Sequence, residues 1–502
     1  MSLLGIDVGT SGCKAAVFDL SGQLLGAARA EYDHQRPQPG WAELDTPAVW
    51  EQIKTTIRLA VSQAAEPVQA LSVSSLGEAV VPVTAGRQIL GPSLLNFDSR
   101  GAEYLPELAA KLPPERLYRI NGNTPGNHYT LTKLLWLQRC RPGLYRQTDW
   151  FLHWSGFVAF MLGAEPVVDR SLANRTLLFD LDAGDWSDEL LEIAGLDRQH
   201  LPPVVSAGRV IGQVAAVTAA ELGLPAGIPI ISGAHDQCCN GIGCGVIRPG
   251  LAMFGMGTFA CMMPVFDRRP EAAMMLARGL NTEHHAMPGQ YVSFIYNQGG
   301  ALVRWFRDTF AAAERQAASL SGADLYASLL AEMPAGPSRL LALPHFTTTG
   351  PPNFIADSSG LIAGLKLETP RGEILKALIE GDAFYLRESM ESLPDAGIEI
   401  DAFRAAGGGS QSSAWIQVLA DILGRPFVRL RIGEAGALGA AILAGAGCGV
   451  FPSIQAGVER MVQLERQFWP DPTLHARYTE RFSLYRRLYP LMGETLQTLA
   501  AG

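Results

Sequence analysis

Two stretches in opposite halves of the chain share one pattern: an apolar strand, a turn rich in glycine and threonine, and a second strand. The first runs from Leu3 to Phe18, with its turn at Gly9–Gly12. The second runs from Gly250 to Asp267, with its turn at Gly255–Thr258. One such hairpin is common, but a repeat that opens each half of a chain is typical of a duplicated domain. The repeat predicts two related α/β lobes whose turns face each other across a cleft.

Composition narrows the class of protein. The chain has 502 residues, a formal net charge of −9 and 48% hydrophobic residues, which is typical of a well-buried globular protein with more than one domain. No lysine or arginine cluster forms a stripe, so nucleic acid and anionic membrane surfaces are poor candidate partners. No apolar run is long enough to span a bilayer, and the first residues lead into a strand without a signal peptide.

The cysteines and one histidine pair were considered as metal ligands. The seven cysteines form no spaced pairs, which predicts neither a disulfide scaffold nor a zinc site and fits a reducing cytoplasm. Cys238, Cys239 and Cys244 are expected to be small packing residues. His284 and His285 have no carboxylate pattern near them and are expected at the surface.

Apolar runs predict several helices around the strands. The runs Trp150–Leu162 and Pro370–Leu393 are each long enough for a helix. The small residues of Glu434–Ala441 predict a helix that packs closely beside the Gly-rich segment at Gly407–Gly409.

The first turn has the composition of a phosphate-binding loop. Asp7 ends an apolar strand, and Gly9–Gly12 supplies free backbone N–H groups and hydroxyls. Such a loop can hold phosphate oxygens while the carboxylate holds Mg²⁺, usually through water. A simple tight turn is the alternative at this point of the argument.

A third feature is the trio His-Asp-Gln at residues 235–237, which follows the apolar run that begins at Ile228. A carboxylate at the exit of a buried strand, with small residues after it, is well placed to face a cleft. Asp236 is therefore interpreted as a general base for a substrate hydroxyl. The alternative is that Asp236 caps the helix that starts there.

Two further glycine turns precede predicted helices. Asn297–Phe306 enters an amphipathic helix after a pair of glycines, and Arg404–Gln417 contains three consecutive glycines before a helix. Three glycines let the backbone approach a planar or anionic ligand closely, and a helix N-terminus favours negative charge.

Taken in order, these motifs resemble the FGGY family of carbohydrate kinases, and the resemblance covers nearly the whole chain. It extends to Pro39–Glu43, Lys133–Leu137 and Ser171–Asp180. The resemblance implies an α/β fold of two ribonuclease-H-like lobes, of the actin and hexokinase type, around a central cleft for ATP and sugar. The lobes are expected at residues 1–246, with the sugar and the base, and 247–502, with the nucleotide.

The resemblance also implies a role for individual residues. Asp236 would accept the proton of the attacked sugar hydroxyl, Gln237 would help to hold the substrate, and Asp7 would lie near Mg²⁺. The remaining positions would contact ATP: Thr10, Ser11, Lys14, Gly257, Thr258, Gly300, Gly408, Gly409 and Ser412. Alignment and charge stabilisation dominate such a phosphoryl transfer.

Departures from the family pattern bear on the substrate. Leu76-Gly77-Glu78 stands where glycerol kinases carry Arg-Glu and xylulokinases carry Gln-Met-His, so Glu78 is a candidate acceptor for sugar hydroxyls; the alternative is a solvated loop residue. Asp98 and Arg100 match a pair found near the sugar site, with a local ion pair as the alternative.

Two positions stay without an assigned role. His235 precedes the base where many relatives have a small residue, and it is expected to be a packed or hydrogen-bonding neighbour. Arg304 stands where glycerol kinases have a Gln near the nucleotide.

The resemblance implies an ATP- and Mg²⁺-dependent kinase that phosphorylates a terminal hydroxyl of a small open-chain sugar, with D-xylulose as first choice. Glycerol, another polyol, gluconate and a deoxy-ketose are the alternatives. An actin- or chaperone-type ATP-binding module without sugar chemistry is the competing class, and a catalytically inactive relative is a second competitor. A homodimer is a family-level expectation.

Overall fold

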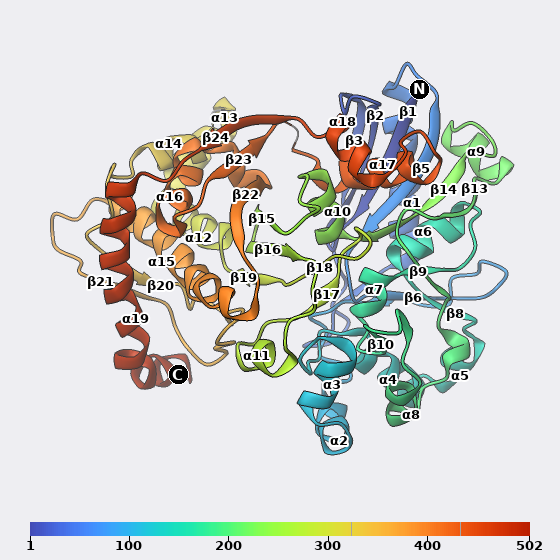
Figure 1. The fold of residues 1–502 in the computed structure, drawn as a ribbon, viewed down its shortest axis with the longest axis horizontal. Helices are drawn as coiled ribbons and strands as arrows, with labels where there is room; N and C mark the ends of the chain where they lie inside the picture. Colours follow the sequence, from blue (N-terminus) through green and yellow to red (C-terminus); the bar gives the residue numbers. More distant parts are fainter. Residues whose placement is uncertain (323, 432, 502) are drawn as a thin grey trace.

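The computed structural model describes residues 1–322, 324–431 and 433–501, which form two lobes side by side (Figure 1). Each lobe is built on one main sheet. The first sheet has six strands in the order β13-β14-β5-β1-β2-β3. Their bounds are β1 Ser2–Val8, β2 Gly12–Asp19, β3 Leu24–Glu31, β5 Val68–Ser75, β13 Val210–Gln213 and β14 Pro229–His235.

The second sheet has eight strands in the order β17-β18-β16-β15-β22-β23-β24, with β19 also paired to β16. Their bounds are β15 Gly250–Met256, β16 Ala260–Phe266, β17 Glu283–His284, β18 Tyr291–Val292, β19 Ile295–Asn297, β22 Ile400–Ala406, β23 Phe427–Leu430 and β24 Leu464–Phe468.

The centre of both sheets repeats one arrangement. In the first, β1 pairs with β2 as an antiparallel hairpin and with β5 in parallel. In the second, β15 pairs with β16 as an antiparallel hairpin and with β22 in parallel. The predicted duplication is therefore present in the strand pairing, and each glycine turn lies at the same end of its hairpin.

Long helices cover the sheets and continue the duplication. In the first lobe, α1 (Thr46–Gln63) packs on β2 and β3, and α6 (Trp154–Leu162) packs on β5 and β14. In the second lobe the main helices are α12 Gly300–Phe310, α15 Arg371–Ser392, α16 Ser413–Leu423 and α19 Pro472–Ala501. None of the helices in the described ranges is long and apolar enough to cross a membrane.

The other elements surround these layers. In the first half they are β4 Glu43–Leu44, β6 Val80–Val83, β7 Ser93–Leu94, α2 Leu105–Lys111, α3 Pro114–Asn121, α4 Thr130–Cys140, α5 Pro142–Gln147, β8 Trp150–His153, β9 Val168–Asp169, α7 Arg170–Asn174, β10 Phe179–Asp180, β11 Asp185–Trp186, α8 Asp188–Ala194, β12 Val204–Val205, α9 Ala216–Leu222 and α10 Asp236–Gly243. In the second half they are α11 Ala272–Ala277, α13 Ala312–Ser321, α14 Leu325–Ala331, β20 Leu341–Leu343, β21 Leu361–Ala363, α17 Ala435–Gly447 and α18 Ile454–Met461.

One predicted helix was too long. The run Trp150–Leu162 begins as strand β8, which pairs antiparallel with β6, and becomes helical only at Trp154. A short continuous apolar run does not distinguish a buried strand from the start of a buried helix, which explains the error.

The position predicted for the small-residue helix is also wrong. Helix α17 packs on α10 and on β1 and β5 of the first sheet rather than beside the Gly-rich segment (Figure 1). Glycines allow this close approach: a Cβ on Gly439 would lie 1.9 Å from the carbonyl oxygen of Cys239, and one on Gly5 would lie 1.8 Å from that of Ala437. A helix of the second half thus completes the first lobe, and a domain boundary after residue 246 stays a prediction.

The contact between α17 and α10 gives a test of stability. We expect Gly439→Ala to lower the free energy of unfolding by about 1–3 kcal/mol, because the added methyl group forces the two helices apart. Urea denaturation measures this loss. Gly143→Ala in α5 is the control, since a Cβ there meets no atom within 4 Å. An equal loss in both variants would contradict the close-packing argument.

Candidate active site

The first glycine turn places Asp7 at the end of β1. Ser74, at the same level of the parallel strand β5, donates a hydrogen bond of 2.7 Å to its Oδ1 atom. Lys14 lies opposite Asp7 in the hairpin and forms a 2.9 Å ion pair with Glu434. Burial raises the pKa of Asp7. A buried carboxylate with one hydroxyl donor fits the predicted role of holding a cation such as Mg²⁺.

The second glycine turn is tied to the start of α12. The N–H of Gly300 donates to the carbonyl of Gly257 at 3.0 Å, and the N–H of Ala301 donates to that of Thr258 at 2.9 Å. A Cβ on Gly300 would lie 2.3 Å from the oxygen of Gly257, so the contact requires glycine. The turn at Gly257–Thr258 and the start of α12 at Gly300, both predicted to contact ATP, therefore form one rigid unit.

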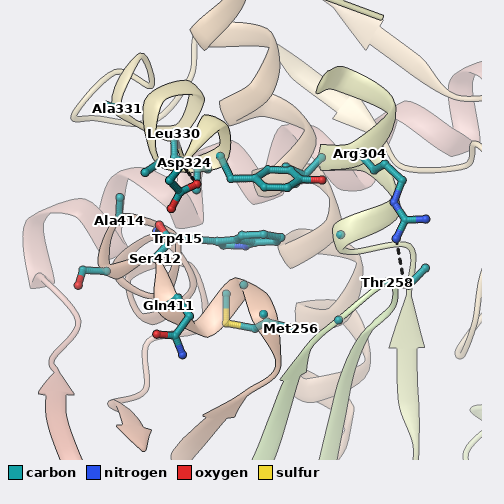
Figure 2. A pocket seen from close by; sticks show the side chains of 18 residues that line it. Met256, Thr258, Arg304, Asp324, Leu330, Ala331, Gln411, Ser412, Ala414 and Trp415 are labelled. Atoms are coloured by element: carbon teal, nitrogen blue, oxygen red, sulfur yellow. Dashed lines mark hydrogen bonds between the residues drawn. The ribbon is translucent and has the colours of Figure 1, made fainter. Parts of the chain in front are cut away.

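A cavity of about 720 Å³ lies against this unit in the second lobe (Figure 2). It is lined by six of the residues predicted to bind ATP, namely Gly257, Thr258, Gly300, Gly408, Gly409 and Ser412. Ser412 caps α16 by accepting a 3.2 Å hydrogen bond from the N–H of Trp415. The other predicted ATP contacts, Thr10, Ser11 and Lys14, belong to the turn of the first lobe and do not line the cavity.

Arg304, Tyr326 and Trp415 are among the lining residues that were not predicted to bind ATP. Figure 2 shows Arg304 beside Thr258, with the Trp415 ring reaching into the cavity from the other side. Arg304 donates a 3.4 Å hydrogen bond to Thr258, and among the described residues no carboxylate forms an ion pair with it. An aromatic residue in the first turn of the helix that follows a glycine loop is the sequence signal that could have pointed to Trp415.

Asp236 is the first residue of α10 and directly follows β14. His235 holds the cap position, so the alternative interpretation of Asp236 as the helix cap is wrong. Its Oδ1 atom lies 3.2 Å from Nε2 of His235 and accepts a 3.2 Å hydrogen bond from Gln237. About 25% of the Asp236 side chain stays exposed.

The charges around Asp236 show where it lies between the lobes. Burial raises the pKa of Asp236 to about 7, and the carboxylates of Asp7 and Glu78 in the first lobe add to this rise. On the other side, the charge of Asp236 contributes to the raised pKa of Cys261, on β16 next to the second turn. The predicted base is therefore close enough to Asp7 of the first hairpin and to Cys261 of the second for its charge to act on both.

A buried ion cluster lies close to His235, the neighbour of this base. Arg175 pairs with Glu78 and, at 2.6 Å, with Glu283 of the second half. Burial opposes ionisation of Glu78, but Arg175, with His128 and His235, lowers its pKa below the ordinary value. The alternative of a solvated Glu78 is wrong. Arg175 itself was missed, although it lies within the segment Ser171–Asp180 used for the resemblance.

Asp98 and Arg100 belong to a separate buried network. Arg100 pairs with Asp98 and with Glu43, each at 2.6 Å, and its guanidinium stacks 4.1 Å from the ring of Trp41. Lys133 donates to the backbone carbonyl of Asp98 at 2.6 Å. These contacts agree with the alternative that Asp98 and Arg100 form a local ion pair. A direct role of these two residues at the sugar stays a prediction.

The histidine pair lies elsewhere than predicted. His285 is buried, with its Nε2 atom 2.9 Å from the carbonyl of Val246, and His284 is half-buried, with its Nε2 atom 3.1 Å from the carbonyl of Leu181. His284 ends β17 at the edge of the second sheet and His285 follows it, and their place next to α10 buries them.

The Arg175 cluster gives a second test of stability. We expect Arg175→Met to lower the free energy of unfolding by about 3–5 kcal/mol at neutral pH, because Glu78 and Glu283 lose their shared buried cation. Chemical denaturation measures this loss. Arg116→Met, which breaks an exposed pair with Glu189, is the control and is expected to cost less than about 1 kcal/mol. A similar small cost for both variants would mean that the cluster contributes little.

Comparison with known proteins identifies the family. Residues 2–243 match the N-terminal domain and residues 252–448 match the C-terminal domain of the FGGY family of carbohydrate kinases. Autoinducer-2 kinase of Escherichia coli (strain K12) is 32% identical over 511 residues, and that of Salmonella typhimurium (strain LT2) is 30% identical over 518. Each alignment covers 97% of this chain and 94% of the relative.

A solved structure agrees with this result. The xylulose kinase of Rhodospirillum rubrum superposes with a TM-score of 0.87 at 27% identity, covering 99% of this chain and 100% of that chain. The predicted fold of two lobes is confirmed, and the enzyme class is that of a kinase rather than an actin-like binding module. The chain belongs to the FGGY family of carbohydrate kinases.

Proposed function

We propose that this enzyme transfers the γ-phosphate of ATP to a terminal hydroxyl group of a small open-chain sugar. Asp236 carries the proposal, because its partly exposed carboxylate follows β14 at the sheet edge where Asp7 lies near the end of β1, and its charge acts on groups of both glycine-turn hairpins. A carboxylate there can accept the proton of a hydroxyl as that oxygen attacks the phosphate. The proton leaves late in such a reaction, so a carboxylate is a sufficient base.

The second lobe supplies the nucleotide site. Trp415 and the glycines at 408 and 409 line the cavity where the adenosine would lie, and Gly257 and Thr258 form the turn where the phosphates would lie. Arg304, with no carboxylate ion pair among the described residues, adds a positive charge next to Thr258. Preorganised donors and charges of this kind stabilise the transferring phosphate.

The first lobe would meet the same phosphates from the other side. Thr10 and Ser11 form the tip of its turn, and Lys14 would exchange its partner Glu434 for a phosphate oxygen. Asp7 is the residue that would hold Mg²⁺, which when bound would neutralise phosphate charge. Asp7 raises the pKa of Asp236, so a cation beside Asp7 would also favour the ionised base.

The sugar would lie next to Glu78 and Gln237. A Cβ at position 77 would lie 3.1 Å from Nε2 of His235 and 3.3 Å from Nε of Arg175. The room that the arginine of a glycerol kinase would need is therefore taken, and the cation beside Glu78 comes from Arg175. This departure from the glycerol kinase pattern makes glycerol a less favoured substrate.

Two candidate substrates have the strongest support. D-xylulose is supported by the similarity to xylulose kinases, and autoinducer-2 is supported by the higher identity to autoinducer-2 kinases. Gluconate, polyols and deoxy-ketoses complete the panel of candidate substrates. A cytoplasmic location and a homodimer stay predictions.

Replacement of the base tests the reaction. The wild-type enzyme is expected to release ADP in the presence of at least one member of this panel, measured with a coupled assay. Asp236→Asn is expected to bind ATP normally but to lose sugar-dependent turnover by about 1,000-fold or more, because the amide cannot accept the proton. Turnover like that of the wild type in this variant would remove Asp236 from the mechanism.

The pH dependence follows from the pKa of about 7. Because the base works in its ionised form, kcat/KM for the sugar is expected to fall about tenfold per pH unit below the pKa and to level off above it. Initial rates between about pH 5.5 and pH 8.5 check this profile, with folding confirmed at each pH by circular dichroism. A flat profile across this range would show that the free enzyme's base does not titrate there.

A further inference from the structure

His235 contacts the proposed base directly. It is the last residue of β14, its N–H donates a 3.0 Å hydrogen bond to Oγ of Ser171, and its ring packs edge-on against Phe294 with centroids 5.3 Å apart. These contacts come from both halves of the chain and fix the imidazole. Its Nε2 atom lies 3.2 Å from Oδ1 of Asp236.

The protonation of this imidazole follows from its surroundings. Burial, and then the positive charge of Arg175, lowers the pKa of His235 to about 3 although Glu78 opposes this, and His153 adds to the decrease. The ring is therefore neutral and carries a single N–H. Nδ1 is buried without a hydrogen-bond partner among the described residues. The tautomer with hydrogen on Nε2 is the one that presents a donor, not a lone pair, to the carboxylate.

Both neighbours of the base act on the same oxygen. Gln237 donates to Oδ1 of Asp236, and Nε2 of His235 faces that atom. Within the described ranges, no side chain donates a hydrogen bond to Oδ2. An Nε2 N–H turned toward Oδ1 would give that oxygen a second side-chain donor and make it the less basic of the two, so the proton of a substrate would go to Oδ2.

We propose that His235 is a positioning residue, which together with Gln237 holds Oδ1 of Asp236 so that Oδ2 faces the hydroxyl of the sugar. This inference rests on the proposed function. In the reaction the sugar oxygen forms a bond to the γ-phosphorus, the bond to the ADP oxygen breaks, and the hydroxyl proton moves to Oδ2. His235 gains and loses no proton in this step.

Substitutions at His235 separate positioning from packing. His235→Leu removes the donor, and we expect kcat to fall about 10- to 100-fold, as for the loss of a hydrogen bond to a charged group. KM for sugar and for ATP is expected to change less than about twofold, since His235 is proposed to contact Asp236 and neither substrate. His235→Gln carries an amide N–H to a similar point, and kcat is expected to recover to within about fivefold of the wild type.

His153→Leu is the matched control. His153 is equally buried and both its ring nitrogens lack a hydrogen-bond partner among the described residues, so its replacement is expected to leave kcat unchanged. Thermal unfolding of all variants reports folding. If His235→Leu does not fold, His235→Phe, which keeps an aromatic ring against Phe294, takes its place with the same expected loss.

The outcomes are distinct. Unchanged kcat in His235→Leu would overturn the inference, and so would an equal loss in the Leu and Gln variants, because packing would then explain it. A wild-type enzyme that releases no ADP with any member of the sugar panel would instead overturn the proposed function, and the inference with it.

Discussion

The burial of negative charge between the two lobes is the constraint on which the site depends. Asp7 lies near the end of β1 and Asp236 directly follows β14, and both strands are parallel neighbours of β5. The carboxyl ends of parallel strands meet at one edge of a sheet, where ligands bind in α/β proteins. Asp7 and Glu78 each raise the pKa of Asp236. The fold therefore keeps a carboxylate half-ionised near neutral pH, which suits a general base.

Close backbone packing makes this burial possible. Helix α17 of the second half lies on α10 and on β1, and a Cβ on Gly436 at its start would come within 2.9 Å of Oδ2 of Asp7. Larger residues would hold the helix away and admit water to the carboxylates. The ion pair between Arg175 and Glu283 joins the halves on the opposite side of the base. The residues of the predicted site are thus flanked by elements from both halves of the sequence.

Local sequence predicted the parts of the site that depend on local geometry. The glycine turns at 257 and 407–409 and the strand-to-helix turn at Asp236 need particular residues at fixed spacing, and these patterns were readable. Contacts between distant residues were not. Arg175 contacts Glu283, which is 108 residues away in the sequence. The small residues of α17 indicate that another element packs closely against this helix, but they do not identify that element. The prediction of a helix at Trp150–His153 was wrong for a different reason, because a continuous apolar run has no periodicity that distinguishes a strand from a helix.

In the proposed mechanism, catalysis and substrate choice would reside in different atoms of this site. Asp236, with its neighbours His235 and Gln237, would act on any hydroxyl delivered to Oδ2, whereas Glu78 would be the acceptor that selects what is delivered. Because Arg175 keeps Glu78 ionised and also binds Glu283 of the other half, the charge that selects the sugar is coupled to the contact between the halves. A change of substrate within such a site would therefore need matched changes at Gly77, Glu78 and Arg175, while the base could stay as it is.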